Sequence, residues 1–163
     1  NQHGAITNGR ISRDQLNFTR KAFEQAETSD FRIVVAHHHF SPAPDYEGGE
    51  VMPKAKRALD EFSQLGVELI LGGHLHRAYI GNSLDVYPGE DRDRGIIIVQ
   101  SGTTTSRRGR AREQEKNSFN VLELSDDSIQ VNHWLYFDSE SQFAPVSHHE
   151  FPRPAARHFA NEQ

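Results

Sequence analysis

The chain has 163 residues, of which 35% are hydrophobic and 25% charged, and its formal net charge is −5. This composition is that of an ordinary soluble globular domain, and the negative charge gives no general attraction to nucleic acid. There is no cysteine, so disulfides and thiolate metal sites are excluded and a bound metal must use His, carboxylate or amide ligands. No apolar run approaches the roughly 20 residues of a membrane helix, so we expect no membrane span.

The start of the chain gives few targeting signals. The sequence begins with Asn1, and its single methionine, Met52, lies far inside it, so we expect a fragment or a processed chain. The first residues lack the basic and apolar segments of a signal peptide. We expect a cytoplasmic location.

Two helices are predicted from their caps and apolar spacing. Ser12 and Gln15 match the Ser-x-x-Gln capping box, which predicts a helix from about residue 13 to 26. A second helix is predicted from about residue 53 to 65, because a proline suits its first turn and Gly66 suits its C-terminal cap.

Three short apolar runs have the length of strands: "FRIVVA" (31–36), "VELIL" (67–71) and "GIIIVQ" (95–100). The first has the β-branched composition of a strand buried on both faces, and the second is also expected to be buried. Further on, "SFNVLEL", "DDS" and "IQVNHWLYF" together predict a β-hairpin. From about residue 141 onward the sequence has little periodicity, and an irregular tail is predicted.

The order helix, strand, helix, strand favours an α/β fold in which the first two strands pair in parallel. Ligand sites of open α/β sheets lie at the carboxyl ends of the strands. Each of the three apolar strands is followed there by polar or small residues, namely His37, then His74 and His76, then Ser101 and Gly102. We therefore expect these residues at one edge of the sheet.

The histidine spacing indicates a metal site. If the segment is extended, His74 and His76 point to opposite sides, so they suit two neighbouring ions better than one. His37 could complete one of those sites together with His74. Gly72 and Gly73 remove side-chain bulk where the backbone approaches ions or substrate. Two metals about 3.5–4 Å apart can deprotonate a bridging water and hold a phosphoryl group for in-line attack.

The motifs "VVAHHHFSP" and "LILGGHLHRA" resemble the last two metal-binding motifs of the calcineurin-like metallophosphoesterases, with "SGTTTS" and "NSFNVLEL" similar to the branch of class III cyclic-nucleotide phosphodiesterases. The resemblance covers about residues 9–137. It implies the C-terminal half of an α/β/β/α sandwich, with mixed sheets and helices outside. The whole of 1–163 is expected to form one domain, with the tail from about residue 141 attached.

The resemblance also implies roles for the histidines. His37 and His74 would bind one divalent ion and His76 a second, the metals being Mn, Fe, Zn or Co, while His38 would be a catalytic or substrate-side residue. His39 could share that role or pack in the interior. The family's Asp-x-His, Gly-Asp and Gly-Asn-His motifs, which include the carboxylate that bridges the metals, do not occur in this sequence.

The expected activity is hydrolysis of a phosphoester small molecule by a metal-bridging hydroxide. This requires an N-terminal half of the domain as partner, so the chain alone should be inactive, and a homo-oligomer is an alternative way of completing it. The competing hypothesis is a non-catalytic, degenerate domain that binds a metal or ligand. A nucleic-acid partner is disfavoured by the net charge.

The remaining polar clusters have mainly structural interpretations. His133 and His158 are expected to be structural or solvated, and His148 and His149 to be surface residues. The basic run 106–112 is interpreted as a solvated loop, with a phosphate entrance as the alternative. For Arg77, a substrate contact and a packing role are equally expected. Solvated loop positions are expected for the acidic residues that follow the first histidine cluster: Asp45, Glu47 and Glu50.

Overall fold

The computed structural model describes residues 9–27, 31–44, 51–87, 95–110 and 113–153. It is a mixed α/β protein with two sheets and few helices, which confirms the predicted fold class. The chain divides into two compact units. Unit 1 comprises Asn1–Gly72 and Ile80–Val99, and unit 2 comprises Gly73–Tyr79 and Gln100–Gln163. Within the described ranges, no helix has both the length and the apolar character needed to span a membrane.

The two helices predicted for the first half are both present in unit 1. Helix α2 (Arg13–Glu24) begins with the predicted capping box, in which the Gln15 N–H donates to Ser12 Oγ (3.2 Å) and the Ser12 N–H donates to Gln15 Oε1 (2.9 Å). Helix α3 (Ala55–Gln64) begins two residues later than predicted, because Lys54 has φ 65° and cannot belong to a right-handed turn.

The sheet of unit 1 has four strands in the order β1-β2-β4-β3. Its strands are β1 (Ile33–Val35), β2 (Leu69–Gly72), β3 (Tyr79–Asn82) and β4 (Ile97–Gln100). Strands β1 and β2 are parallel, with Val35 opposite Leu71, which confirms the predicted pairing. Strand β3 and the short helix α4 (Ser83–Val86) lie in a polar stretch for which the sequence predicted no element.

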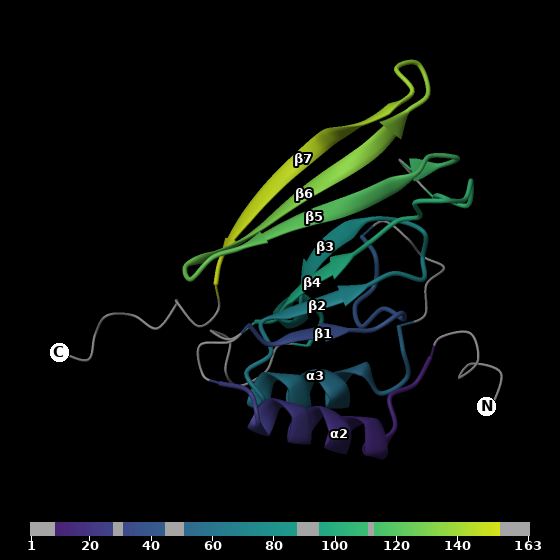
Figure 1. Ribbon diagram of the computed structural model, residues 1–163. Helices are drawn as coiled ribbons and strands as arrows, with labels where there is room; N and C mark the ends of the chain where they lie inside the picture. Colours follow the sequence, from purple (N-terminus) through teal and green to yellow (C-terminus); the bar gives the residue numbers. More distant parts are fainter. Residues whose placement is uncertain (1–8, 28–30, 45–50, 88–94, 111–112, 154–163) are drawn as a thin grey trace. The chain divides into compact units, whose positions relative to one another are not determined.

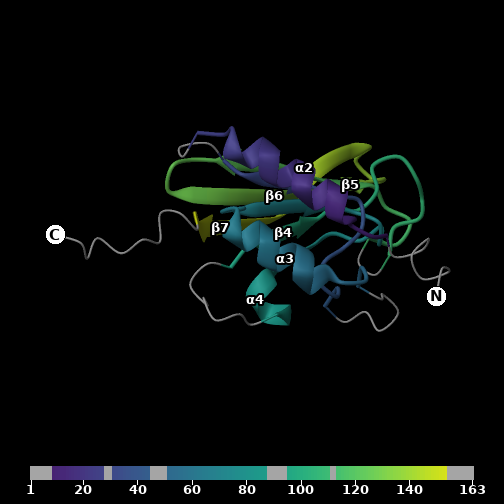
Figure 2. The same ribbon diagram turned by 90° about the horizontal axis from the view of Figure 1, so that it is seen from below.

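The core of unit 1 lies between helices and sheet. Figures 1 and 2 show α2 and α3 side by side against the same face of β1 and β2, and Arg20 Nε of α2 donates to Glu61 Oε1 of α3 (2.9 Å). The core side chains come from both layers and include Leu16, Leu59, Phe62, Ile70, Ile96 and Ile98.

Strand β1 differs from its prediction. Val35 is 78% exposed, so β1 is not buried on both faces. Val34 packs against the core, whereas Val35 points to the opposite face of the strand, which is exposed. Strand β1 also lies at the edge of the sheet, with β2 as its neighbour on one side. Strand β2 has neighbours on both sides, and its residues Leu69 and Ile70 are fully buried.

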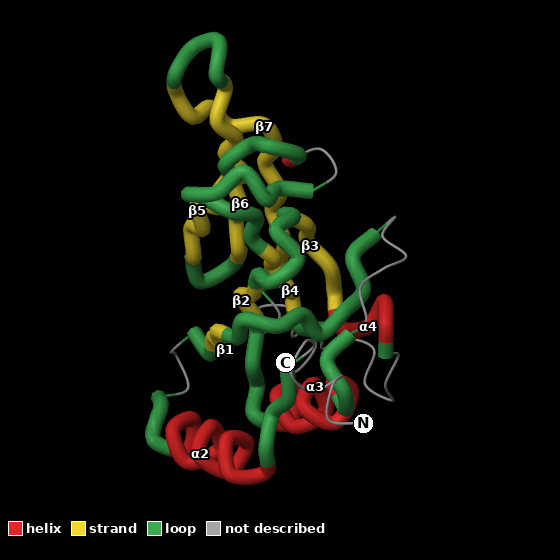
Figure 3. The backbone as a smooth tube through the Cα atoms, turned by 90° about the vertical axis from the view of Figure 1, so that its right-hand side faces the viewer, coloured by secondary structure: helices red, strands yellow, loops and turns green. Residues whose placement is uncertain are grey.

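Unit 2 contains a three-stranded antiparallel sheet in the order β5-β6-β7 (Figure 3). Strands β5 (Ser118–Leu124) and β6 (Ser128–Phe137) form the predicted hairpin, whose turn includes a hydrogen bond from the Ser125 N–H to the Ser128 carbonyl (2.9 Å). Ile129 and Val131 of β6 are fully buried.

The predicted irregular tail is wrong for residues 142–152, which form strand β7 (Gln142–Pro152) paired with β6. The register shifts between His133 and Trp134, which pair with Ser147 and Pro145, so Val146 is an extra residue on β7. A bulge of this kind changes the phase of the inward and outward alternation in the middle of the strand. The period-2 pattern was therefore hidden, and proline is tolerated at such a position.

Candidate functional site

The first histidine cluster follows β1 and divides into accessible and buried members. His37 is exposed and His38 half-buried, and their rings are perpendicular with centroids 4.9 Å apart. His39 is only 1% exposed, and its carbonyl accepts a hydrogen bond from the Met52 N–H (3.2 Å). His39 therefore packs in the interior of unit 1, while His37 and His38 present two neighbouring imidazoles.

The position of His38 depends on a glycine near the start of the described chain. Gly9 has φ 71°, and a Cβ built on it would lie 2.4 Å from both Cγ and Nδ1 of the His38 ring. The backbone of Gly9 thus lies directly against the imidazole, where no side chain fits. Neither the positive φ nor this contact was predicted from the sequence.

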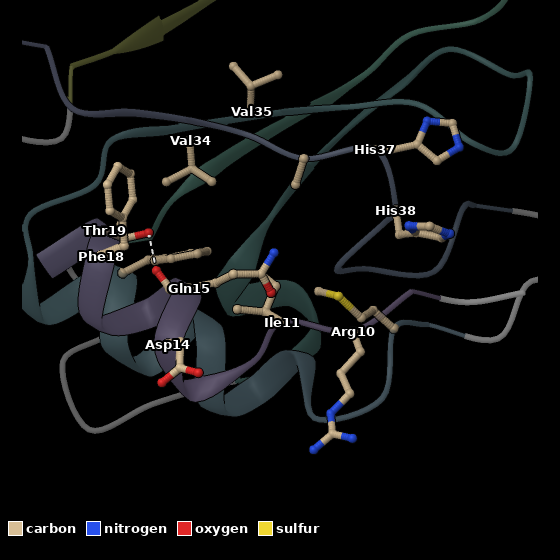
Figure 4. Close-up of a pocket in the computed structure, with 13 residues that line it drawn as sticks. Arg10, Ile11, Asp14, Gln15, Phe18, Thr19, Val34, Val35, His37 and His38 are labelled. Carbon is tan, nitrogen blue, oxygen red and sulfur yellow. Dashed lines mark hydrogen bonds between the residues drawn. The ribbon is translucent and has the colours of Figure 1, made fainter. Parts of the chain in front are cut away.

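A pocket of about 590 Å³ lies beside this cluster, between α2 and β1. Figure 4 shows His37 and His38 at one end of the pocket and the side chains of α2 along it. Its lining combines imidazole, guanidinium, carboxylate and apolar groups, and includes His37, His38, Arg10, Asp14, Phe18 and Val35.

The second histidine cluster lies in the segment Gly73–Tyr79, here called the histidine loop. His74 and His76 have φ values of 75° and 54°, and the Leu75 N–H donates to the Gly73 carbonyl (2.9 Å). The loop is therefore tightly turned, and the assumption of an extended segment is wrong. Leu75, between the histidines, is buried.

Two hydrogen bonds hold this loop against the rest of unit 2. The Arg110 N–H donates to the carbonyl of His76 (3.0 Å), and the Ala78 N–H donates to Glu113 Oε1 (2.7 Å). Both partners come from the segment that follows β4. The two bonds flank Arg77, so the backbone that directly follows His76 is held.

Glu113 is the centre of a buried polar network. It is 4% exposed, Ser118 Oγ donates to its Oε2, and His133 Nε2 lies 3.4 Å from its Oε1. Burial raises the pKa of Glu113, but hydrogen bonds from His133, Ser118 and the Ala78 N–H, and the charge of His133, outweigh burial and leave the pKa below the ordinary value of 4.5. The carboxylate is therefore ionised at neutral pH.

The network continues from His133 to the end of β4. His133 Nδ1 lies 2.8 Å from Asn120 Oδ1, and Asn120 Nδ2 donates to the Gln100 carbonyl and to Ser101 Oγ, both at 3.2 Å. Both ring nitrogens of His133 thus face oxygen atoms. The structural role expected for His133 is confirmed.

Glu113 and Asn120 were not predicted from the sequence as residues of this network. A usable signal existed for Asn120, because the predicted hairpin places it directly opposite His133 in the observed register. No comparable signal existed for Glu113, whose partners come from three separate segments.

The other sequence candidates carry less information. Arg107, Arg108 and Arg110 are exposed, in keeping with a solvated loop. His148 and His149 are exposed on β7, as expected, and Arg77 is half-buried. Outside the described residues lie Asp45, Glu47, Glu50, Arg112 and His158.

The predicted ligands are distributed over both units. His37 belongs to unit 1, whereas His74 and His76 belong to unit 2. In chain order, His37 follows the last residue of β1 by two positions, and His74 follows the last residue of β2 by two. Their convergence on a common metal centre stays a prediction.

Comparison with protein-family models and with curated proteins gave no match. Comparison with solved structures gave matches to Vps29 proteins of several organisms. Vps29 of Chaetomium thermophilum is 14% identical, with a TM-score of 0.48 over 79% of this chain and 59% of that chain. A double mutant of Entamoeba histolytica Vps29 is 22% identical, with a TM-score of 0.40 over 64% of this chain and 52% of that chain. Vps29 of Cryptosporidium parvum is 13% identical, with a TM-score of 0.44 over 78% of this chain and 55% of that chain. This chain thus spans between half and three-fifths of their length.

Proposed function

We propose that this chain is the C-terminal part of a metal-dependent phosphoester hydrolase, in which His37, His74 and His76 bind divalent metal. The observation that carries the proposal is the parallel pairing of β1 with β2, Val35 opposite Leu71. Histidines that follow two neighbouring parallel strands by the same two positions are delivered to the same sheet edge.

The side chains in place suit such a metal. All three proposed ligands are histidines with at least partial exposure, and neutral imidazole binds Zn, Fe, Mn and Co. When bound, divalent ions would lower the pKa of a coordinated water and polarise a phosphoryl oxygen. His38 lies beside His37, and we propose that it contacts the substrate or a leaving group. The pocket next to it provides Arg10, whose guanidinium suits phosphate oxygens.

A carboxylate bridges two metals in this class of enzyme, and the family motif that carries it does not occur in this sequence. In unit 2, the buried carboxylate of Glu113 is already engaged by Ala78, Ser118 and His133. We therefore propose that an N-terminal segment, in the same or a second polypeptide, supplies it. The chain alone is expected to bind metal weakly and to hydrolyse nothing.

The test is calorimetric titration of residues 1–163 with Mn²⁺ and Zn²⁺, comparing the unsubstituted chain with His74→Ala and His37→Ala. Each substitution removes one proposed ligand and should weaken binding at least tenfold. His149→Ala, an exposed histidine on β7, serves as control and should leave binding unchanged. Equal affinity in all four proteins would contradict the proposed site.

A parallel assay with bis(p-nitrophenyl) phosphate separates the two candidate functions. Turnover on addition of an N-terminal half that carries the missing motifs would support the hydrolase. Metal binding with no turnover in that complex would instead support the non-catalytic metal-binding domain. Turnover by residues 1–163 alone, abolished in His74→Ala, would show that the site is already complete.

A further inference from the structure

We propose that Glu113 is a positioning residue that holds the histidine loop in the conformation needed for metal binding. The inference rests on the proposed function, in which His74 and His76 are metal ligands. In the interactions described above, the Glu113 carboxylate bonds to neither histidine side chain. It acts on the loop through the backbone N–H of Ala78.

The histidine loop needs such support because its backbone is unfavourable. His74 and His76 both have positive φ, a region that residues with a Cβ occupy rarely. Two such residues separated by a single position persist only where the surroundings impose them. A loop released from its contacts would relax toward negative φ and carry both imidazoles to new positions.

The contacts that hold this conformation flank Arg77, directly after His76. The Arg110 N–H binds the His76 carbonyl, and the Glu113 carboxylate binds the Ala78 N–H. The second bond has an ionised acceptor, which makes it stronger than a bond between neutral groups. Glu113 and Arg110 are joined by a further backbone hydrogen bond (3.1 Å), so one short segment supplies both contacts.

Glu113 is itself held rigidly, as a positioning group must be. Its second oxygen accepts from Ser118 of β5, and His133 of β6 faces the first. Gly102 and Gly109 pack against it so closely that a Cβ at either would lie within 2 Å of a Glu113 atom. The position of the carboxylate is thus set by both strands of the hairpin and by the loop after β4.

The experiment measures Co²⁺ binding to residues 1–163 by visible absorption, at a temperature well below unfolding. Glu113→Ala removes the acceptor, and we expect Co²⁺ affinity to fall about 10–100-fold, the range observed when groups that orient metal ligands are removed. Glu113→Gln keeps an acceptor oxygen but loses the charge, and should lose less than Glu113→Ala. Asp126→Asn, at an exposed turn, makes the same carboxylate-to-amide change and should have no effect.

A second measurement does not depend on metal. Hydrogen exchange of the Ala78 amide, followed by NMR in the metal-free chain, should accelerate in Glu113→Ala relative to amides of β6. A purely structural role for Glu113 would lower the melting temperature while leaving Co²⁺ affinity and the shape of its absorption band unchanged. That result would overturn the proposal.

The remaining outcomes are also decisive. If the unsubstituted chain binds no Co²⁺, the proposed function fails and the inference fails with it. If it binds Co²⁺ and Glu113→Ala binds equally well, the inference alone fails. If Glu113→Ala does not fold, Glu113→Gln decides the question: a loss of about tenfold supports positioning, and unchanged affinity with unchanged Ala78 exchange contradicts it.

Discussion

At the scale of single residues, Gly102 shows how little space the Glu113 network leaves. A Cβ on Gly102 would lie 1.9 Å from Glu113 Oε2 and 2.2 Å from Ser118 Oγ, so an alanine there must displace one of these groups. Gly102→Ala should therefore lower the free energy of unfolding by about 1–3 kcal/mol, the usual cost of overpacking. Denaturation followed by the fluorescence of Trp134, the single tryptophan, measures this in unit 2.

Gly73→Ala is the matched control for this prediction. The nearest atom to a Cβ at Gly73 is the Ser101 carbonyl oxygen at 4.0 Å, which leaves room for a methyl group. Equal destabilisation by the two substitutions would show that the close contacts of Gly102 are unimportant.

The ionisation of Glu113 has a consequence for stability against pH. Because its folded-state pKa lies below the ordinary value of 4.5, the unfolded chain binds the proton more readily. The stabilising contribution is complete above the unfolded pKa and is lost as the pH falls through the folded pKa. The groups that face the carboxylate are His133, Ser118 and the Ala78 N–H.

The difference in unfolding free energy between the unsubstituted chain and Glu113→Gln should consequently be constant above about pH 5 and shrink below about pH 4.5. Trp134 fluorescence in urea at a series of pH values measures it. A difference that grows as the pH falls would mean that the pKa of Glu113 is raised in the folded state.

At the scale of elements, helix α2 depends on its capping box. The reciprocal hydrogen bonds of Ser12 and Gln15 satisfy two backbone N–H groups at the helix start. Ser12→Ala should cost about 1 kcal/mol of stability. Circular dichroism during thermal unfolding measures it, and Ser139→Ala, exposed between β6 and β7, provides a comparison in which no cap is lost.

How far the sequence determines an element depends on how local its causes are. Helix α2 was predictable because its cap and apolar spacing lie within the helix. The β5-β6 hairpin was predictable from its turn residues, whereas β7 was not, because the extra residue Val146 breaks the alternation. Strand β1 was predicted to be buried on both faces because its composition is that of a buried strand. Composition does not show whether other elements cover each face of the strand in this chain.

In the candidate site, too, only the features with local causes could be predicted from the sequence. The histidines that follow β1 and β2 were visible as motifs, and their place after two parallel strands was predicted correctly. The positive φ of His74 and His76 was not, and the two residues that bond to the loop backbone after His76, Arg110 and Glu113, are distant from it in sequence. A spacing of two residues alone gives no information about such a turn.

At the scale of the molecule, unit 1 exposes apolar side chains around the edge strand. Val35 is 78% exposed and Phe18 of α2 is 75% exposed, and both line the pocket beside His37. We expect this surface to be covered by the N-terminal partner segment invoked above. Residues 1–163 alone should therefore bind an apolar dye such as ANS and self-associate.

The double substitution Phe18→Ser with Val35→Thr should reduce both dye fluorescence and association in size-exclusion chromatography without lowering the melting temperature, because exposed side chains contribute little to the folded core. Val146→Thr, on a 46% exposed residue of β7, is the control. A monomeric chain that binds no dye would argue that unit 1 needs no partner.

The Glu113 network also sets an order of events during synthesis. The histidine loop leaves the ribosome before Glu113, and Glu113 before His133, so a nascent chain that has just exposed His74 and His76 lacks every group that fixes their backbone. Glu113 has all of its partners only after β6 has been made and has paired with β5, since His133 and Ser118 hold the carboxylate from those two strands. Contacts of such sequence separation form late in folding. A metal ion that met the newly made loop would meet two histidines whose backbone these groups do not yet hold, and the ordered pair would arise only after β6 has been made.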